Sequence, residues 1–225
     1  FNRIVLFSLF VFVFSNCSNE NSDNKDGLFT KLESSKTGIN FVNEVKNGKN
    51  MNIFKYRNFY NGGGVSIGDI NNDGLADVFF TSNLGENKLY LNKGNFKFQD
   101  ISKSSGIVVP KSWSTGVEMV DINGDGLLDI FVCNAGNGID ATRKSELFIN
   151  NGNLTFTEKA AEYNLAETGI TTHAAFFDYD KDGDLDVYIL NNSFIPVSSL
   201  NYSNKRELRD KDWAVNNILK GGGDK

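Results

Sequence analysis

The residues best able to do chemistry in this 225-residue chain lie in three short acidic loops. Each loop has side-chain oxygens at positions 1, 3, 5 and 9 and a glycine at position 6. This is the ligand order of a calcium loop, in which the backbone carbonyl of position 7 is a further ligand. A calcium ion needs about six to eight oxygens at about 2.3–2.6 Å, and a glycine that tolerates positive φ lets the backbone curl around it. The predicted ligands are Asp69, Asn71, Asp73, Leu75 and Asp77; Asp121, Asn123, Asp125, Leu127 and Asp129; and Asp178, Asp180, Asp182, Asp184 and Asp186.

The acidic loops could also be EF-hands or turns that bind no metal. An EF-hand needs a glutamate at position 12 and flanking helices, but position 12 is Phe80, Val132 and Ile189, within β-branched and aromatic runs. A metal-free turn remains open, because Asp, Asn and Gly are ordinary turn formers. Turn formation alone does not explain three copies or the acid at position 9, and crowded carboxylates repel one another without a cation. We therefore expect calcium, and we expect the third loop, with five aspartates, to depend on it most.

The loops belong to a longer repeat, with spacings of 52 residues (69 to 121) and 57 residues (121 to 178). Each loop joins two strand-like segments, and a second hairpin and a closing strand follow. Four strands per repeat predict an all-β, partial β-propeller of about two and a half blades. The expected divisions are blade one at 61–112, blade two at 113–170 and an incomplete blade three at 171–225 with a polar insertion at 197–222.

Residues 28–60 are interpreted as the lead-in to blade one. The segment 28–39 resembles 98–107, which closes blade one, so it is predicted to be an outer strand without a blade before it. Such a strand could complete the last blade of a closed ring or could simply cap blade one. The chain opens with phenylalanine rather than methionine and stops before the third strand of blade three, so we expect a fragment of a longer protein.

The first residues have the pattern of a targeting segment. Arg3 precedes an apolar run at 4–14, which is too short to span a bilayer comfortably. The run ends near Cys17 and resembles a bacterial lipobox, which implies a signal segment at 1–17, lipidation of Cys17, and a flexible tether at 18–27. The expected location is outside the cytoplasm, on an outer membrane or cell surface. A secreted protein and a membrane-anchored protein are the alternatives.

Charge and cysteine content restrict the possible partners. The net charge of −5 and the lack of a basic stripe disfavour nucleic-acid binding. Cys133, the other cysteine, lies in a predicted strand and is expected to be a small buried hydrophobic residue.

The residues 62–77 and their counterparts at 115–129 and 173–186 together resemble a known family, the FG-GAP/VCBS repeat. That repeat is similar to the calcium-bearing blades of integrin alpha subunits, and bacterial lipoproteins that carry it often resemble the cartilage acidic protein group. The resemblance covers about residues 28–225 and implies a propeller fold with calcium at the positions named above. It implies no substrate, because such blades occur in adhesins, scaffold proteins and some polysaccharide lyases.

Two classes of function follow, and the first is a binding module. Propeller loops lie on two faces suited to partners, so we expect a glycan or protein partner at the cell surface, with calcium holding the loops. Trp113, Tyr60 and Phe59 flank the blade starts and could stack on a sugar, although packing between blades also explains them.

The alternative is a fragment of a calcium-dependent polysaccharide-degrading enzyme. The sole histidine, His173, precedes the first strand of blade three without a visible catalytic partner, and most carboxylates are assigned to calcium. We therefore predict no catalytic residue and favour the binding module.

Overall fold

The computed structural model describes residues 28–49, 51–107, 112–135 and 144–192. The predicted signal segment, Cys17, the tether and the polar insertion lie outside the described residues. The chain divides into two units, and residues 28–32 belong to the first, Phe1–Leu32. All described strands belong to the second, Glu33–Lys225. No described helix is long and apolar enough to cross a membrane.

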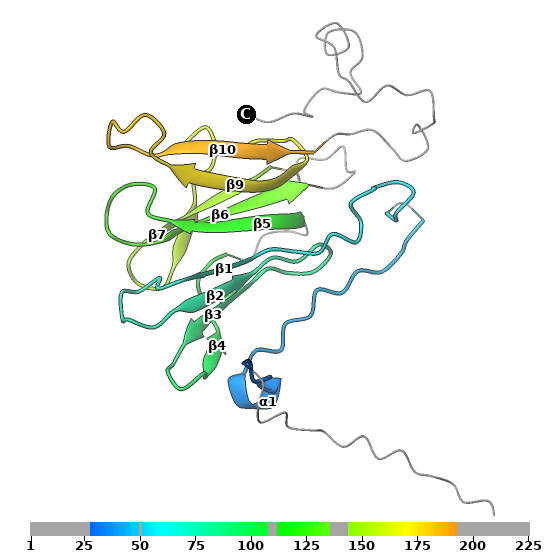
Figure 1. The fold of residues 1–225 in the computed structure, drawn as a ribbon, viewed down its shortest axis with the longest axis horizontal. Helices are drawn as coiled ribbons and strands as arrows, with labels where there is room; N and C mark the ends of the chain where they lie inside the picture. Colours follow the sequence, from blue (N-terminus) through cyan, green and yellow to red (C-terminus); the bar gives the residue numbers. More distant parts are fainter. Residues whose placement is uncertain (1–27, 50, 108–111, 136–143, 193–225) are drawn as a thin grey trace, which may run out of the picture. The chain divides into compact units, whose positions relative to one another are not determined.

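The described strands form three antiparallel sheets, one in each repeat (Figure 1). Blade one has the order β1-β2-β3-β4, blade two has β5-β6-β7-β8, and blade three pairs β9 with β10. This confirms the all-β, partial propeller-like prediction. The bounds are β1 Val65–Gly68, β2 Asp77–Phe80, β3 Lys88–Asn92, β4 Phe98–Asp100, β5 Trp113–Val120, β6 Asp129–Ala135, β7 Glu146–Asn150, β8 Phe156–Glu158, β9 Thr171–Phe177 and β10 Asp186–Asn191.

The register at the acidic loops is the same in all three sheets. In each, the residue before loop position 1 pairs with the aspartate at position 9: Gly68 with Asp77, Val120 with Asp129, and Phe177 with Asp186. Each loop therefore closes a hairpin between the first and second strands, and position 9 is already the first residue of a strand.

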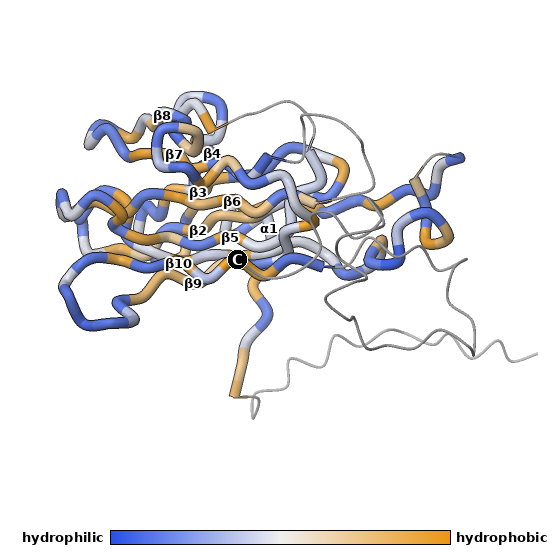
Figure 2. Tube along the Cα trace, turned by 90° about the horizontal axis from the view of Figure 1, so that it is seen from above, coloured by the Kyte–Doolittle hydropathy of each residue, from blue (hydrophilic) through white to orange (hydrophobic). Residues whose placement is uncertain are grey.

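Blade two lies between blades one and three, so β6 is buried at every residue. Because side chains of a strand alternate between its two faces, Ile130 and Val132 pack in a core cluster with blade one. Phe131 and Cys133 pack in a second cluster with blade three. Figure 2 shows hydrophobic residues along these strands and hydrophilic residues in the loop from β9 to β10. The prediction that Cys133 is buried is confirmed, and burial raises the pKa of its thiol to about 12.

A third cluster attaches the lead-in to blade two. Phe59 and Trp113 pack in it with their rings 5.3 Å apart, and they are 0% and 6% exposed. The packing interpretation therefore holds for these two aromatics, and neither offers a free face to a sugar. Tyr60 remains 60% exposed, and its hydroxyl bonds to Asn47.

The structure differs from the predicted outer strand at 28–39. The described residues there contain no strand, and the short helix α1 spans Ser34–Thr37. Gly38 ends it in a left-handed conformation (φ 82°) and donates its N–H to the carbonyl of Ser34 at 2.7 Å. A Cβ at Gly38 would lie 2.5 Å from the Phe98 carbonyl, and Gly106 (φ 82°) lies in the same way against Phe156. The resemblance between the two segments therefore reflects a shared turn that packs on the next outer strand.

Candidate metal centres in the acidic loops

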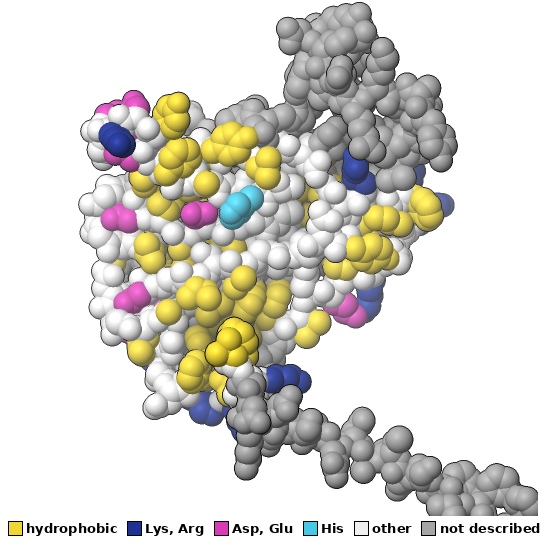
Figure 3. All heavy atoms as spheres, viewed as in Figure 1, with side chains coloured by type: hydrophobic (Ala, Val, Ile, Leu, Met, Phe, Trp, Pro, Cys, Tyr) yellow, Lys and Arg dark blue, Asp and Glu magenta, His cyan; other side chains and the backbone are white. Residues whose placement is uncertain are grey.

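The three loops lie along one edge of the second unit, at the ends of the first strands (Figure 1). Figure 3 shows acidic side chains along the same edge. Because each first strand is joined to the second by its loop in the same register, the three loops repeat one geometry.

In the first loop the carboxylates accept hydrogen bonds from the loop's own backbone. Asp69 accepts N–H groups from Asp73 at 3.1 Å and Gly74 at 2.7 Å, and Gly74 has φ 84°. Asp73 accepts the N–H of Leu75 at 2.9 Å and the amide of Asn71 at 3.0 Å. Burial is the largest single influence and raises the pKa of Asp69, but the backbone N–H bonds of the loop together lower it below its ordinary value. The loop thus holds the charged form of Asp69.

The second loop repeats these contacts. Asp121 accepts N–H groups from Asp125 at 3.0 Å and Gly126 at 2.8 Å. Asp125 accepts the N–H of Leu127 at 2.8 Å and the amide of Asn123 at 2.9 Å. Two independent copies of the same hydrogen bonds indicate that the spacing of loop residues dictates the curl, and it brings positions 1, 3 and 5 together.

The aspartate at position 9 has a structural role that the sequence did not suggest. Asp129 is completely buried, and its two oxygens accept the N–H of Ile122 at 3.1 Å and that of Asn150 at 2.8 Å. It therefore ties the start of the loop to the end of the third strand. At Asp77 the corresponding donors are Ile70 at 3.0 Å and Asn92 at 2.7 Å.

These buried aspartates are electrostatically disfavoured as anions. Burial raises the pKa of Asp77 and Asp129; the N–H bonds lower it, and the carboxylates at positions 5 and 1 raise it again. In both cases the overall shift is upward, so the N–H groups alone do not compensate for the negative charge. A cation among positions 1, 3, 5 and 9 would compensate for it.

The third loop brings its carboxylates closest together. Oxygens of Asp178, Asp180 and Asp186 all lie within 4.8 Å of one another. Two oxygens at about 2.6 Å from one ion are at most about 5.2 Å apart, so these three fit a shared calcium ion. They form the one group of three acidic, His or Cys side chains that meets this distance among the described residues.

The other two aspartates of the third loop interact with each other. Asp182 accepts the N–H of Asp184 at 3.1 Å. This bond and a side-chain bond between them lower the pKa of Asp182, whereas the same side-chain bond and the charge of Asp182 raise the pKa of Asp184. The side chains of Asp182 and Asp184 thus lie outside the three-carboxylate group. For Asp184, at position 7, the predicted ligand was the backbone carbonyl and not the side chain.

The donor chemistry suits calcium in all three loops. The loops contain carboxylate, amide and backbone oxygens and no cysteine or histidine, as expected for a hard cation rather than a transition metal. Loops one and two have an asparagine at position 3 in place of Asp180. Carboxylates of all three loops accept backbone N–H groups, in the third loop those of Tyr179 and Gly183, so each loop is held partly by hydrogen bonds.

Asn150, at the end of β7, is a contributor that the sequence analysis missed. Its amide donates to the carbonyl of Ile70 in loop one at 2.8 Å and to that of Leu128 in loop two at 3.1 Å. Its backbone N–H donates to Asp129. The sequence could have indicated this role, because both complete repeats have an asparagine at the end of the third strand, Asn92 and Asn150.

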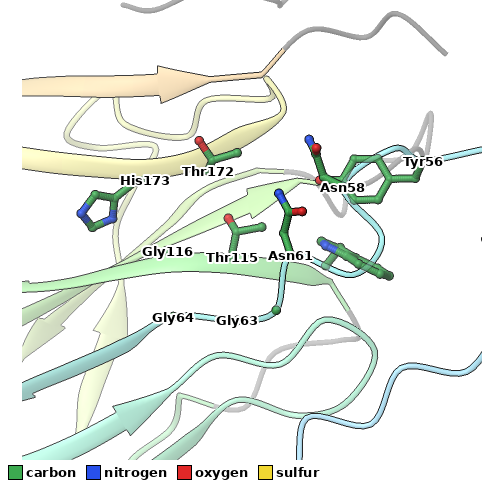
Figure 4. A pocket seen from close by; sticks show the side chains of 11 residues that line it. Tyr56, Asn58, Asn61, Gly63, Gly64, Thr115, Gly116, Thr172 and His173 are labelled. Atoms are coloured by element: carbon green, nitrogen blue, oxygen red, sulfur yellow. The ribbon is translucent and has the colours of Figure 1, made fainter. Parts of the chain in front are cut away.

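His173 lies away from the acidic loops, at the opposite end of β9. Its Nε2 is 4.0 Å from a carboxylate oxygen of Glu118, and its side chain is 57% exposed. It lines a pocket with Gly64, Gly116 and Thr172 (Figure 4). The described pocket residues contain no nucleophile and base arranged for catalysis.

Comparison with known proteins agrees with this geometry. The FG-GAP-like repeat family matches residues 47–132 and 133–189. Cartilage acidic protein 1 of Xenopus tropicalis is 33% identical over 135 residues, which is 60% of this chain and 20% of the relative. The proteins of the same name in Mus musculus and Homo sapiens are 32% and 31% identical over 58% and 59% of this chain. This chain spans about a fifth of the length of these relatives. With most of its length in these matches, the chain belongs to the FG-GAP-like repeat family.

Proposed function

We propose that this chain is a calcium-stabilised binding module. The repeat family suggests a binding or adhesion-type role and a non-enzymatic one. The observation that supports calcium best is the convergence of Asp178, Asp180 and Asp186 within 4.8 Å, in a loop that the chain repeats three times.

The role of the ion follows from the charges of the loop. Calcium, when bound, supplies positive charge to carboxylates that otherwise repel one another. Asp178, Asp180 and Asp186 would hold it in the third loop, and positions 1, 3, 5 and 9 with the carbonyls of Leu75 and Leu127 would hold it in the other two. The loops would then be fixed for contact with a partner.

The location and partners form part of the same proposal. An exported protein, anchored through a lipid on Cys17, would present the module to a glycan or protein at a bacterial cell surface. Extracellular calcium modules work with weak sites, with Kd of about 10⁻⁴–10⁻³ M, which fits loops as exposed as the third. A polysaccharide lyase fragment is the alternative, and it requires catalytic groups beyond those described.

A capture experiment distinguishes the two candidates. The full chain is immobilised and exposed to a panel of bacterial and extracellular glycans and proteins, in millimolar calcium and in EDTA. We expect calcium-dependent capture without chemical change of the captured molecule. Release of shortened saccharides would support the lyase, and capture that EDTA leaves unchanged would contradict the role of calcium.

A further inference from the structure

Blades one and three each have one side that no described blade covers. In Figure 1 the three sheets lie one above another, with blade two in the middle and blades one and three at the two ends. We call the uncovered side of blade one the front face and that of blade three the rear face. The equivalent sides of blade two are covered by its neighbours, so they show what each uncovered face is shaped to contact.

The front face of blade one carries exposed apolar side chains at positions that pack against a neighbour in blade two. Val65 and Ile67 on β1 are 55% and 65% exposed. The repeat aligns them with Val117 and Met119 on β5, which pack in the core cluster between blades one and two. The front face therefore has the composition of a contact between blades, and exposed apolar patches of this kind commonly mark interaction sites.

The hairpin after β3 shows the same difference. Phe96 and its counterpart Leu154 both have a left-handed backbone, with φ 56° and 63°. Leu154 packs against the core cluster between blades one and two, whereas Phe96 is 68% exposed. A left-handed backbone is unfavourable for a residue with a side chain, and the packing of Leu154 offsets that cost in blade two. The front face thus extends onto this hairpin.

An asparagine of blade one has a counterpart that bonds to the preceding blade. The amide of Asn150 donates to its own acidic loop and also to the carbonyl of Ile70, in the loop of blade one, at 2.8 Å. The amide of Asn92 donates to its own loop at Ala76, at 2.8 Å, and makes no second bond among the described residues. The residue of blade three that the repeat aligns with Ile70 is Tyr179, so its carbonyl is the equivalent acceptor.

The rear face of blade three is also apolar. Tyr188 and Leu190 on β10 are 46% and 43% exposed, and Phe177 at the end of β9 is 43% exposed. The counterparts of Tyr188 in the other two blades, Phe79 and Phe131, are completely buried against the next blade. The rear face therefore has the composition of a surface that contacts a following blade.

Side-chain sizes match the rear face of blade three to the front face of blade one. Where blades one and two meet, a Cβ on Gly68 would lie 2.6 Å from the side chain of Leu128. The residue aligned with Gly68 in blade three is Phe177, and the residue aligned with Leu128 in blade one is Ala76. A large residue on the rear face would thus meet a small one on the front face, as close packing requires.

The charges of the two faces are complementary as well. The hairpin after β3 carries exposed Lys93 and Lys97, where blade two has Asn151 and Thr155. In blade two the equivalent hairpin begins beside the acidic loop of the preceding blade, to which its asparagine bonds. The third acidic loop, at 178–186, has five aspartates and one lysine, so it stays negative even with one calcium ion bound. Two cations would therefore lie beside the most acidic of the three loops.

The lead-in covers another part of the front face. Phe41 stacks on Phe80 with ring centroids 5.0 Å apart, and Asn40 accepts the hydroxyl of Tyr90 at 3.0 Å. Ile67, nearer the acidic loop, remains exposed. The area open to a partner is thus smaller than a whole blade side, and small interfaces are typical of weak association.

We propose that the rear face of blade three in one copy of this chain binds the front face of blade one in a second copy, head to tail. Phe177 would pack against Ala76, and Asn92 would donate to the carbonyl of Tyr179. The contact is heterologous, because each copy uses a different face for each of its two neighbours. This inference concerns a surface and does not depend on the proposed binding function.

The test follows the mass of the full chain by sedimentation velocity in millimolar calcium, from about 1 µM to about 1 mM protein. We expect association with a Kd of about 10⁻⁵–10⁻⁴ M. Species larger than a dimer should appear at the highest concentrations, because a heterologous contact leaves one face open at each end. A monomer at every concentration, or growth that stops at a dimer, would overturn the proposal.

Two variants, one on each face, test the geometry. Ile67→Lys on the front face and Tyr188→Lys on the rear face should each weaken association at least tenfold. Phe54→Lys, at a 77% exposed aromatic on the lead-in, is the matched control and should associate as the wild type does. If either variant unfolds, Phe96→Lys or Leu190→Lys replaces it on the same face.

Mixing the two variants is the decisive measurement. Ile67→Lys keeps an intact rear face and Tyr188→Lys keeps an intact front face, so the mixture should form a dimer and nothing larger. A mixture that stays monomeric, although both variants melt as the wild type does, would contradict the head-to-tail contact. So would either variant alone if it still associated as the wild type does.

Charge reversal tests the placement of the hairpin. Lys93→Glu combined with Lys97→Glu should weaken association at least tenfold, because the hairpin would then repel the third acidic loop. Lys46→Glu combined with Lys49→Glu, at exposed positions of the lead-in, is the control and should leave association unchanged. Equal association of the two double variants would contradict the proposed contact.

Discussion

The second and third acidic loops share one register but stabilise their position 9 aspartates differently. Asp129 is fully buried and accepts N–H groups from the loop and from the third strand. Asp186 is exposed, and among the described residues it accepts the N–H of Tyr179 at 2.8 Å. Position 9 thus ties the loop to the third strand in blade two. In blade three the described residues include no third strand, and Asp186 stands with Asp178 and Asp180 in a cluster of carboxylates.

One loop motif can thus tie the strands of a blade together through position 9 and can also gather carboxylates that share an ion. Backbone hydrogen bonds hold all three loops, but in blades one and two position 9 also accepts an N–H group from the third strand, so an ion there adds to a more complete structure. In the third loop the acidic groups at positions 1, 3 and 9 face one another, so an ion removes repulsion directly. The variants and conditions below should affect the two kinds of loop unequally.

The largest effect is expected from truncating the buried aspartate. Asp129→Ala leaves the N–H groups of Ile122 and Asn150 unpaired, which should lower the free energy of unfolding by about 3 kcal/mol even in EDTA. Asp186→Ala, at an exposed position, should cost less than about 1 kcal/mol under the same conditions. Urea unfolding of both variants measures this, and equal losses would contradict the comparison.

Calcium should raise the cost of removing a ligand from the third loop. At about a hundredfold excess over Kd, one site adds about 2.7 kcal/mol to the stability of the wild type. Asp180→Ala removes the side-chain ligand at position 3, where loops one and two keep an asparagine oxygen, so it should lose this gain and bind one ion fewer by calorimetry. Glu162→Gln, an exposed acid on a turn, is the control and should keep both. The same ion count in Asp180→Ala and wild type would show that the third loop is assigned wrongly.

Local features of the sequence predicted most of the fold. The acidic loops and the second hairpins are encoded by residues close together in the chain, and each appears where expected. Features that depend on neighbouring blades could not be predicted. They include the turn at Gly38 in place of a strand, and the second role of Asp129, which depends on where Asn150 lies after folding.

A partly buried acid outside the loops, Glu146, should contribute a separate dependence on pH. Burial raises the pKa of Glu146 on β7 to about 7, the amide of Asn134 lowers it in part, and the charge of Glu158 raises it. Because this folded-state pKa is above the unfolded value, the folded state binds more protons than the unfolded state between about pH 4.5 and 7. Stability from this group is therefore present at low pH and is lost as the pH rises through that window.

Glu146→Gln tests this pH dependence and separates it from the pH dependence of the loop carboxylates. Replacing the carboxyl with a neutral amide should remove a loss on the order of 1–3 kcal/mol between pH 4.5 and 7. Urea unfolding in EDTA across this range provides the measurement. An unchanged pH profile would assign all of the pH dependence to the loop carboxylates instead.

The smallest effect is expected from a link between loops one and two. The amide of Asn72 donates to the carbonyl of Gly126 at 2.9 Å, and Asn72 has φ 57°. Asn72→Gly removes the bond without straining this conformation, so it should cost about 0.5–1 kcal/mol. Calcium affinity should fall in loops one and two and stay constant in loop three. A weaker third site in this variant would contradict the separation of the loops.

The central claim is that calcium occupies the acidic loops, and anomalous X-ray scattering from crystals grown in millimolar calcium tests it most directly. We predict a calcium peak in the third loop within about 2.3–2.6 Å of oxygens from Asp178, Asp180 and Asp186, with weaker or equal peaks in the other two loops. Absence of a peak between these three carboxylates at saturating calcium would contradict the account.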